Sequence, residues 1–470
     1  MVSLLALSVP APTRVISDTG DNVDTFIRNS NGGIWDASGA NIQLAIDDLG
    51  TEGGTVWIPD GNYDFSSQIQ IKNNSVRLLG EGQYITFTKT TSIPGGLLLI
   101  NGSGINDMKG NHLIENIEFC NTGYTSAISG AFINCTYISG INIKNCRFRF
   151  NDDEAIIMRT VWNSDISECY IQQCGNVTNG NSSLYYVSAG SGDCEIPWIR
   201  NNLFEGGGDC CINNTDANAN HAQIVDNWFE YENAVPTRAY IYWKGHYATI
   251  KGNDILGNSL TPDVIGILTH GTRSTVSDNE VTYCEVGIEG SWASIIDSNT
   301  MAYCDNGIKT NGGCVVSNNM LQSCGVSVGD IGIDIYGGCT VTGNHINTGL
   351  ENFTQIRVLA TYEGAIISGN RLSGYSKVDY GIHIINSNCH NNSIIGNFFD
   401  GIYDVSAITD SGSNTTIKDN WGYDYSSYQY IPCAASDPYS SPSDGAMYLV
   451  TGNQSLAVYY NGVWNYYEKS

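Results

Sequence analysis

The segments Asn279-Glu-Val, Asn299-Thr-Met and Asn319-Met-Leu recur at intervals of 20 residues in the middle of the chain. The same pattern continues in both directions with gaps of 20 to 27 residues. A recurrence of this length is typical of repeat proteins. Each repeat is rich in Val, Ile, Gly and Asn and contains no amphipathic helical stretch, which indicates a solenoid of strands. The ten asparagines of the pattern are Asn202, Asn227, Asn253, Asn279, Asn299, Asn319, Asn344, Asn370, Asn397 and Asn420.

The asparagines are expected to form a column. Parallel strands lie about 4.8 Å apart, so one residue type at one offset stacks on itself from coil to coil. An asparagine side chain carries both a donor and an acceptor, and can therefore bond to its equivalents above and below. We interpret this column as structural rather than catalytic. Ile117, Cys146 and Cys169 occupy the same position nearer the N-terminus, which predicts one long domain.

Composition narrows the class of protein. The 470 residues carry a net charge of −26, with only 14% charged residues and 53 glycines. Such an acidic chain argues against nucleic acid or an anionic membrane surface as a general partner. No apolar run approaches the roughly 18 residues of a membrane-spanning helix, so membrane insertion is not expected. These features favour a turn-rich β protein at an extracellular or virion surface.

The sequence contains 15 cysteines. Cys284, Cys304 and Cys324 each follow a column asparagine by five residues. This spacing predicts buried thiols stacked inside the coils rather than a disulfide framework, although one or two disulfides remain open. No Cys-x-x-Cys pair indicates zinc.

Residues 42–49 have apolar side chains at helical spacing, with Asn41 as the expected N-cap and Gly50 as the end. Short strands are expected over 53–63, 69–72 and 76–82. Such a helix would cover the open end of a solenoid. This segment resembles the N-terminal cap of the pectate-lyase-like right-handed parallel β-helix superfamily. With the later coils, the resemblance covers about residues 35–425.

The resemblance implies an all-β fold, a right-handed parallel β-helix, with an N-terminal capping helix. It leaves function open, because that superfamily includes polysaccharide lyases, glycoside hydrolases, epimerases and viral tailspikes. The expected domains are an N-terminal arm over 1–34, the β-helix over 35–424, a linker over 425–443 and a small β module over 444–470.

Three strands are expected in the C-terminal module, at 446–450, 456–460 and 463–467, with a hairpin turn at Asn461-Gly462. The module is similar to small terminal modules of viral tail proteins. It therefore favours a viral tailspike or receptor-binding protein. Tyr-rich segments such as 425–430 suit interfaces, and a homotrimer is expected.

An acidic residue three positions before an isoleucine marks a second register. Strand alternation places that isoleucine inside the coil and the next residue, and the one two further on, outside. The acids are either turn residues or calcium ligands, although no calcium loop of fixed spacing is present. These acids are Asp153, Asp209, Glu285, Asp305, Asp330 and Asp379.

The outward positions predict two neighbouring columns that are either a groove for an extended sugar chain or an ordinary solvated face. Glu289, Lys309, Asp334 and Tyr336 are the expected substrate-binding residues. The first column is Ile157, Asn213, Tyr242, Leu268, Glu289, Lys309, Asp334 and His383; the second is Arg159, Thr215, Lys244, His270, Ser291, Asn311 and Tyr336.

Residues 238–273 contain six Lys, Arg and His residues but only two acids. A lyase acting on a uronic-acid polymer needs a cation near the carboxylate and a base for the C5 proton. Tyr242, Lys244, His270 and Arg273 are therefore the candidate catalytic residues. Lys244 and His270 share one offset on successive coils, which predicts a separation of about 5 Å. The alternative is scattered surface charge.

A hydrolase would need two carboxyl groups about 5 to 9.5 Å apart. Glu289 and Asp334, two coils apart in one column, would be separated by about 9.6 Å. Asp209-Cys-Cys-Ile faintly resembles the Gly-Asp-Asp-Cys motif of polygalacturonase-like hydrolases, but the second aspartate and a following Gly-His-Gly are missing. Possible depolymerisation of a polysaccharide therefore stands beside two alternatives, a non-catalytic adhesin or structural fibre and a secreted lyase, hydrolase or epimerase.

Overall fold

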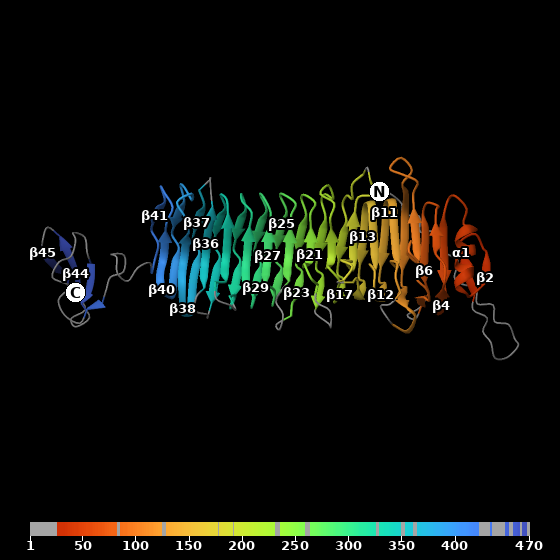
Figure 1. Cartoon of the computed structure of the whole chain (residues 1–470), viewed down its shortest axis with the longest axis horizontal. Helices are drawn as coiled ribbons and strands as arrows, with labels where there is room; N and C mark the ends of the chain where they lie inside the picture. The colour runs from red at the N-terminus through yellow and green to blue at the C-terminus, as the bar shows by residue number, and fades with distance from the viewer. Residues whose placement is uncertain are drawn as a thin grey trace, which may run out of the picture.

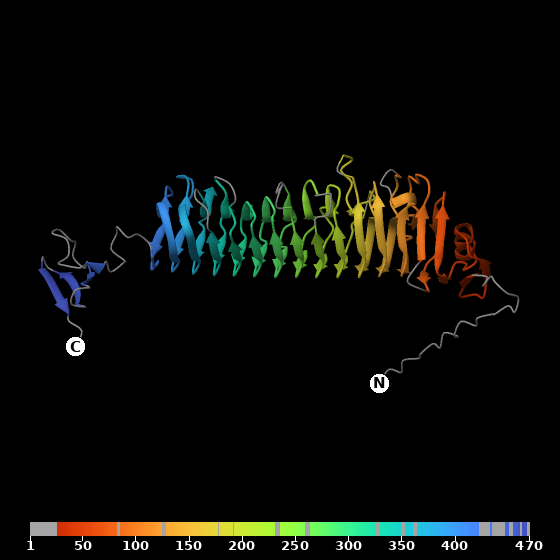
Figure 2. The same cartoon turned by 90° about the horizontal axis from the view of Figure 1, so that it is seen from below.

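The computed structural model describes residues 26–422 except 82–84, 125–127, 177, 191, 231–235, 259–263, 326–328, 349–352 and 361–363, together with four short strands beyond residue 432. The chain winds from the N-terminal to the C-terminal end of a long stack of β coils (Figures 1 and 2). Neighbouring coils pair through parallel strands, as predicted. Each coil contributes to three parallel faces, which we call face 1, face 2 and face 3.

Face 1 carries the outward columns that the sequence predicts. Its strands are β5 (Ile69–Ile71), β8 (Leu98–Asn101), the first parts of β11 (Ile133–Lys144) and β13 (Ile156–Ser167), β15 (Leu184–Val187), β18 (Cys210–Asn214), β21 (Ala239–Trp243), β24 (Ile265–Thr269), β27 (Val286–Gly290), β30 (Asn306–Thr310), β33 (Ile331–Tyr336), β36 (Thr354–Ala360) and the last parts of β38 (Arg371–Ile384) and β40 (Phe398–Asp410).

Face 2 follows face 1 after a turn and leads to the asparagine column. Its strands are β3 (Gly54–Ile58), β6 (Val76–Gly80), β9 (Lys109–Glu115), the last parts of β11 and β13, β16 (Trp198–Arg200), β19 (Gln223–Val225), β22 (Thr249–Lys251), β25 (Thr275–Ser277), β28 (Ile295–Asp297), β31 (Val315–Ser317), β34 (Thr340–Thr342), β37 (Ile366–Ser368), β39 (Ser393–Ile395) and β41 (Thr416–Lys418).

Face 3 follows the asparagine column and closes the coil. Its strands are β4 (Gly61–Phe65), β7 (Ile85–Lys89), β10 (Glu118–Asn121), β12 (Arg147–Asn151), β14 (Tyr170–Cys174), β17 (Leu203–Glu205), β20 (Trp228–Glu230), β23 (Asp254–Leu256), β26 (Glu280–Thr282), β29 (Thr300–Ala302), β32 (Met320–Gln322), β35 (His345–Thr348) and the first parts of β38 and β40.

The first coil is covered by α1 (Gly39–Asp47), whose Ile42, Ala45 and Ile46 are buried. The predicted helix is confirmed, but the expected N-cap is wrong: Ser38 holds the N-cap position, and Asn41 lies inside the helix. The helix starts three residues before the expected first residue, Ile42, because Gly39 and Ala40 already belong to its first turn although they precede the apolar residues at helical spacing. β1 (Phe26–Asn29) and β2 (Ile34–Asp36) pair antiparallel, and β1 also pairs with β3. A short 3₁₀ turn, η1 (Thr122–Tyr124), follows β10.

The asparagine column is confirmed in every coil from Asn202 to Asn420. The side-chain Nδ2 of each asparagine donates to Oδ1 of the next, over 2.9–3.0 Å. The backbone N–H donates to the same Oδ1. Each Nδ2 also donates to a carbonyl of the preceding coil, as Asn299 does to Val276 over 2.9 Å. The column thus satisfies buried polar groups at the corner between faces 2 and 3.

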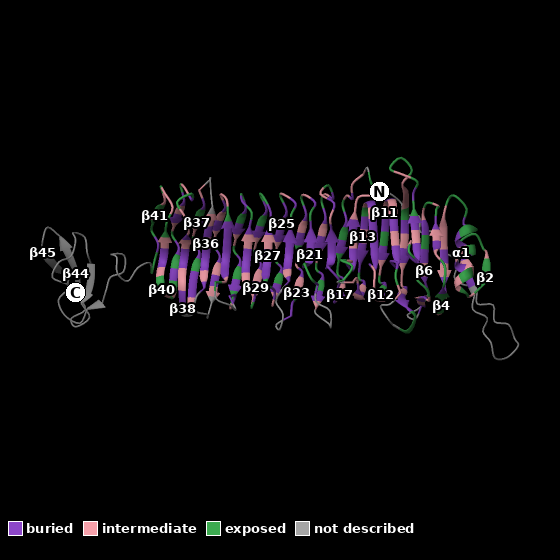
Figure 3. Ribbon diagram, in the orientation of Figure 1, coloured by how far each residue is buried: buried purple, intermediate pink, exposed green. Residues whose placement is uncertain are grey.

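The 14 cysteines whose surroundings are described are buried and form no disulfide with one another, and the predicted column of Cys284, Cys304 and Cys324 is confirmed. The thiols of Cys304 and Cys324 each donate to a carbonyl one coil earlier, over 3.6 Å. The inward residues of all three faces form one continuous apolar core (Figure 3). The thiols act within it as small apolar groups with a weak donor.

The C-terminal segment has β42 (Cys433–Ala434), β43 (Met447–Val450), β44 (Ser455–Tyr460) and β45 (Val463–Tyr467). β44 and β45 pair antiparallel, as expected of a hairpin. The predicted arm before Phe26 and the predicted linker around β42 lie outside the described residues. No helix within the described part of the chain is long and apolar enough to cross a membrane.

Candidate functional site

The first predicted column on face 1 is confirmed by the strand register. Asn213 pairs with Tyr242, Tyr242 with Leu268, and the column continues through Glu289 and Lys309. Between Ile157 and His383 the sequence analysis missed two members of the column, Tyr185 and Arg357. Both residues directly follow an inward residue, Leu184 or Ile356, in coils that lack the acid that marked the register. That inward residue was therefore the only sequence signal for the missed member.

Tyr242 and His270 form the closest contact between the predicted catalytic residues. The hydroxyl of Tyr242 lies 3.4 Å from Nδ1 of His270, and the two rings meet edge to face at 5.3 Å. The Tyr242 side chain points outward but is only 8% exposed, because Cys210, Ala239 and Leu268 pack around it on the outer side of face 1. His270, at the end of β24, is exposed.

Arg238 and Asp209 extend this contact by one coil. The guanidinium of Arg238 lies 4.9 Å from the centre of the Tyr242 ring and forms an ion pair of 2.9 Å with Asp209. Burial raises the pKa of the Tyr242 phenol, and the charge of Arg238 opposes that rise. The phenol is consequently protonated at neutral pH and able to donate a proton. Sequence reasoning placed Asp209 in the acid column but did not identify Arg238 as its partner.

Lys244 lies in the second column, directly after β21, and the strand register places it one coil before His270. Its side chain is exposed and forms no ion pair with the described residues. In contrast, Lys251 on face 2 of the same coil lies 3.5 Å from Asp278. Lys244 is therefore an available positive charge beside the Tyr242–His270 pair.

Arg273 lies apart from the other three, in the turn between faces 1 and 2. Its Nη1 donates to the hydroxyl of Tyr247 over 2.7 Å, and its guanidinium lies 5.7 Å from that ring. The ring of His221, one coil earlier, stacks on the ring of Tyr247, with ring centres 5.2 Å apart. The structure thus brings Tyr242, Lys244 and His270 together, whereas Arg273 belongs to an adjacent stack at the corner.

The first column continues as a row of alternating charges, Glu289, Lys309, Asp334 and Arg357. Asp334 is only 2% exposed and accepts two hydrogen bonds from Arg357, of 2.8 and 3.0 Å. A carboxylate held in this way is committed to the guanidinium. The Glu289–Asp334 pair is thus poorly suited to hydrolysis. Tyr336, by contrast, is 46% exposed in the second column.

The acid column shows no metal site. Within the described ranges, no three His, Cys, Asp or Glu side chains come close enough together to hold an ion. Asp153 and Asp209 instead bond to neighbours: Asp153 accepts from Asn181 over 2.6 Å, and Asp209 from Thr237 over 3.2 Å. A further acid, Glu154, has its pKa raised to about 6, mainly by burial.

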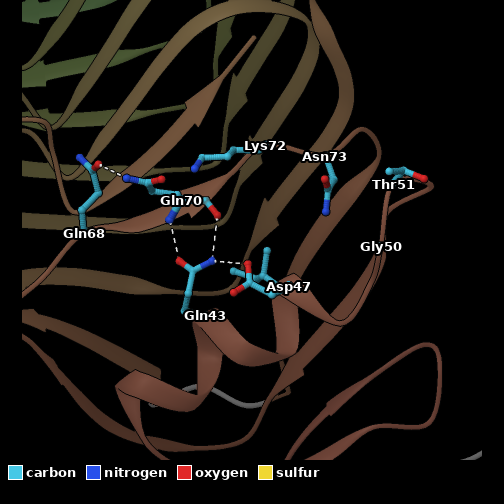
Figure 4. A pocket seen from close by; sticks show the side chains of 9 residues that line it. Gln43, Asp47, Gly50, Thr51, Gln68, Gln70, Lys72 and Asn73 are labelled. Atoms are coloured by element: carbon cyan, nitrogen blue, oxygen red, sulfur yellow. Dashed lines mark hydrogen bonds between the residues drawn. The ribbon is translucent and has the colours of Figure 1, made fainter. Parts of the chain in front are cut away.

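A polar cleft of about 550 Å³ opens at the N-terminal end of face 1, between α1 and β5 (Figure 4). Gln43 of α1 donates to Asp47 over 2.8 Å and exchanges hydrogen bonds with the backbone of Gln70. Gln70 begins the first column, and Lys72 also lines the cleft. The cleft lies six coils before Tyr242 and shares no residue with the Tyr242–His270 pair.

Comparison with protein-family models gives one match over the N-terminal part of the chain. A sequence model described as rhamnogalacturonase A/epimerase, pectate lyase-like, matches residues 22–209. The match covers the cap and the first coils and ends before Tyr242, so it does not bear on the catalytic candidates. No curated protein matches the chain in sequence.

Solved structures with similar architecture come from several functional groups. Tailspike protein 3 of bacteriophage CBA120 is 12% identical with a TM-score of 0.44; the match covers 90% of this chain but only 66% of that longer protein. A mannuronic acid specific polysaccharide lyase from human gut microbiota is 13% identical, with a TM-score of 0.44, over 81% of this chain and 90% of the lyase.

A surface adhesin of Streptococcus pneumoniae is 14% identical with a TM-score of 0.42, over 92% of this chain and 96% of the adhesin. At these identities and TM-scores, none of the three transfers a role to individual residues of this chain. Any functional assignment depends on the side chains of face 1.

Proposed function

Since the chain has the pectate-lyase-like right-handed parallel β-helix fold, we propose that it binds an extracellular polyuronate on face 1 and cleaves it by β-elimination. The observation that carries the proposal is the contact between Tyr242 and His270 beside Lys244, which forms no ion pair with any described residue. Positive groups are scarce in a chain of charge −26, so a polyanion would be repelled elsewhere and held here.

Each side chain has a distinct role in the proposed reaction. Lys244 neutralises the uronate carboxylate, which makes the C5 proton more acidic. His270 takes that proton; the C5–H electron pair forms the C4=C5 double bond, and the C4–O bond breaks. Tyr242, kept protonated by burial, donates its proton to the departing oxygen. The proton on His270 then returns to the tyrosine through their contact.

The test compares a variant that loses Lys244 and His270 on face 1 with one that loses Lys251 on face 2. Lys244→Ala with His270→Ala should lower cleavage of polygalacturonate or alginate by 10²- to 10⁴-fold, the usual contribution of an acid–base pair. Lys251→Ala is the control, because Lys251 is similarly exposed but lies on face 2. Unsaturated product is followed by ultraviolet absorbance. Equal activity of the double variant and the control would contradict the assignment.

The same experiment separates the catalytic proposal from the adhesin alternative. An adhesin would bind the polymer without releasing unsaturated product. In either case we propose an extracellular or virion-surface location, with a viral tailspike or receptor-binding protein as the biological setting. The outward columns of face 1 are the proposed sugar-contacting surface, with Glu289, Lys309 and Tyr336 as direct contacts. Asp334 contributes to this surface by holding Arg357 in place.

A further inference from the structure

The turn between faces 1 and 2 carries a row of small residues interrupted by one indole. Gly245, Gly271, Trp292, Gly312 and Gly337 occupy equivalent positions directly after the second column. Close contacts between the backbones of neighbouring coils show this equivalence. A Cβ on Gly271 would meet the carbonyl oxygen of Gly245, and one on Gly337 would meet the Cα of Gly312. Trp292 is thus the one large side chain at this position in these five coils.

Trp292 lies on the backbone of the next coil. A Cβ on Gly312 would sit 3.4 Å from two atoms of the indole ring, and one on Gly313 would sit 3.8 Å from a third. One side of the ring therefore rests on the two glycines. The side chain remains 57% exposed, which is unusual for so large an apolar group. Glycine at position 271 leaves the other side without a neighbouring side chain from the preceding coil at that position.

The position of Trp292 relative to the proposed catalytic residues is set by backbone contacts. The amide of Ser291 lies 3.4 Å from Oγ1 of Thr269, the residue before His270. The carbonyl of Trp292 accepts from the amide of Arg273 over 3.1 Å. The indole is therefore one coil beyond His270, about 4.8 Å along the axis. It lies on the side of the second column that faces the corner.

Other flat side chains continue this edge. Tyr247, 42% exposed, stacks between His221 and Arg273 in the same turn of the preceding coils. We call His221, Tyr247, Arg273 and Trp292 the corner ridge. It runs parallel to the second column, past Lys244 and His270, so a chain lying on face 1 would be flanked by it.

We propose that Trp292 is a stacking platform for a sugar ring of the polyuronate next to the one whose C4–O bond is cleaved. This inference rests on the proposed function of face 1. The negative face of an aromatic ring attracts the slightly positive C–H bonds on the flat side of a pyranose. The charge of the corner ridge also favours a polyuronate, because the Arg273 guanidinium is positive and Trp292 carries no charge.

The proposal predicts a change in binding with little change in chemistry. Trp292→Ala should raise KM for polygalacturonate or alginate about tenfold and leave kcat within about threefold, since Trp292 does not touch the reacting atoms. Trp292→Phe should recover most of the loss, because it keeps a flat ring. Trp228→Ala is the matched control, because Trp228 is 51% exposed on face 3. Affinity electrophoresis in gels containing each polymer, with dextran as the uncharged polymer, measures binding without turnover.

The outcomes separate the platform from the catalytic proposal. If Trp292→Ala retains the KM and gel retardation of the parent while Lys244→Ala with His270→Ala is inactive, the platform is wrong and the catalytic assignment stands. If Trp292→Ala loses retardation but the parent releases no unsaturated product, the platform is supported and the lyase is wrong. A parent protein that is retarded by neither polymer overturns both. Equal losses in Trp292→Ala and Trp228→Ala would also overturn the platform.

Discussion

At the scale of single residues, the chemistry of face 1 depends on which neighbours surround an ordinary side chain. Tyr242 is flanked by Arg238 on one coil and His270 on another, while an apolar cluster excludes water from its ring. Lys244 shares the same face but keeps its charge in solvent. A protonated phenol, and a cation that forms no ion pair with the described residues, are the two properties that the proposed β-elimination requires.

Replacing Arg238 with Gln should raise the pKa of Tyr242 further. The positive charge of Arg238 favours the phenolate and opposes the effect of burial, so its removal leaves burial unopposed. The titration is followed by NMR of protein labelled with ¹³C at tyrosine Cζ, and the signal is assigned by its loss in Tyr242→Phe. An unchanged or lower pKa in Arg238→Gln would contradict this electrostatic role.

At the scale of elements, the corners of the coil are more regular than its faces. Ladder asparagines and stacked thiols repeat because each must match a backbone group on the neighbouring coil. Those constraints repeat in the sequence as well, which is why the solenoid, the asparagine column and the buried thiols could be predicted. The outward columns followed from alternation alone.

The rest of the candidate site could not be predicted, because it depends on contacts between coils that have no fixed sequence spacing. The ion pair of Arg238 with Asp209 joins residues 29 positions apart, and Arg357 with Asp334 joins residues 23 apart. Arg273 was grouped with Lys244 by charge, but the turn directs it towards Tyr247. Side-chain direction in a turn does not follow strand alternation.

Asn299→Ala should destabilise the protein by about 2–4 kcal/mol. The change removes the acceptor for the backbone N–H and Nδ2 of Asn279, and each buried donor left without its partner costs about 1–3 kcal/mol. Asn311→Ala is the control, because Asn311 is exposed on face 1 and such changes cost within about 0.5 kcal/mol. Urea denaturation followed by circular dichroism compares the two; similar midpoints would contradict a structural ladder.

The buried thiols should make the free energy of unfolding fall steeply above about pH 9. Burial raises the pKa of Cys174 and Cys210 from 9.0 to about 12, and that of Cys194 to about 11. Between pH 9 and those values the unfolded chain loses thiol protons that the folded chain keeps. Their contribution to stability is complete below pH 9 and falls by about 1.4 kcal/mol per pH unit for each thiol above it.

Lys89 acts in the opposite direction and serves as an internal comparison. It is fully buried, donates to the carbonyls of Ser129 and Gly130 and to Asn151, and burial lowers its pKa from 10.5 to about 8. Lys89 therefore adds stability as pH rises from about 8 to 10.5. It is a single group, whereas several thiols lower the stability above pH 9. Cys174→Ala should reduce the slope of unfolding free energy against pH above 9. An unchanged slope would contradict the thiol account.

At the scale of the whole molecule, a net charge of −26 opposes contacts between copies of the chain over most of the stack. Such contacts are favoured where apolar side chains are exposed. Exposed apolar side chains such as Phe398 and Trp421 lie at the last described coils of the stack. We propose assembly as a homotrimer through the sides or ends of the stack. Multi-angle light scattering at micromolar concentration should give three times the chain mass of 50.9 kDa; a monomer would contradict both the trimer and the tailspike setting.

The hydrogen bonds between the ladder asparagines all run one way: each residue donates to the next one along the chain. If coils form in the order of synthesis, the last finished coil presents its asparagine donors, and the newly emerged coil brings the matching Oδ1 acceptor. At roughly 5–20 residues per second a coil is added every few seconds. The donors of the last finished coil can bond only to the asparagine of the coil that follows it. Synthesis from the N-terminus therefore adds coils in the order in which the ladder can stabilise them.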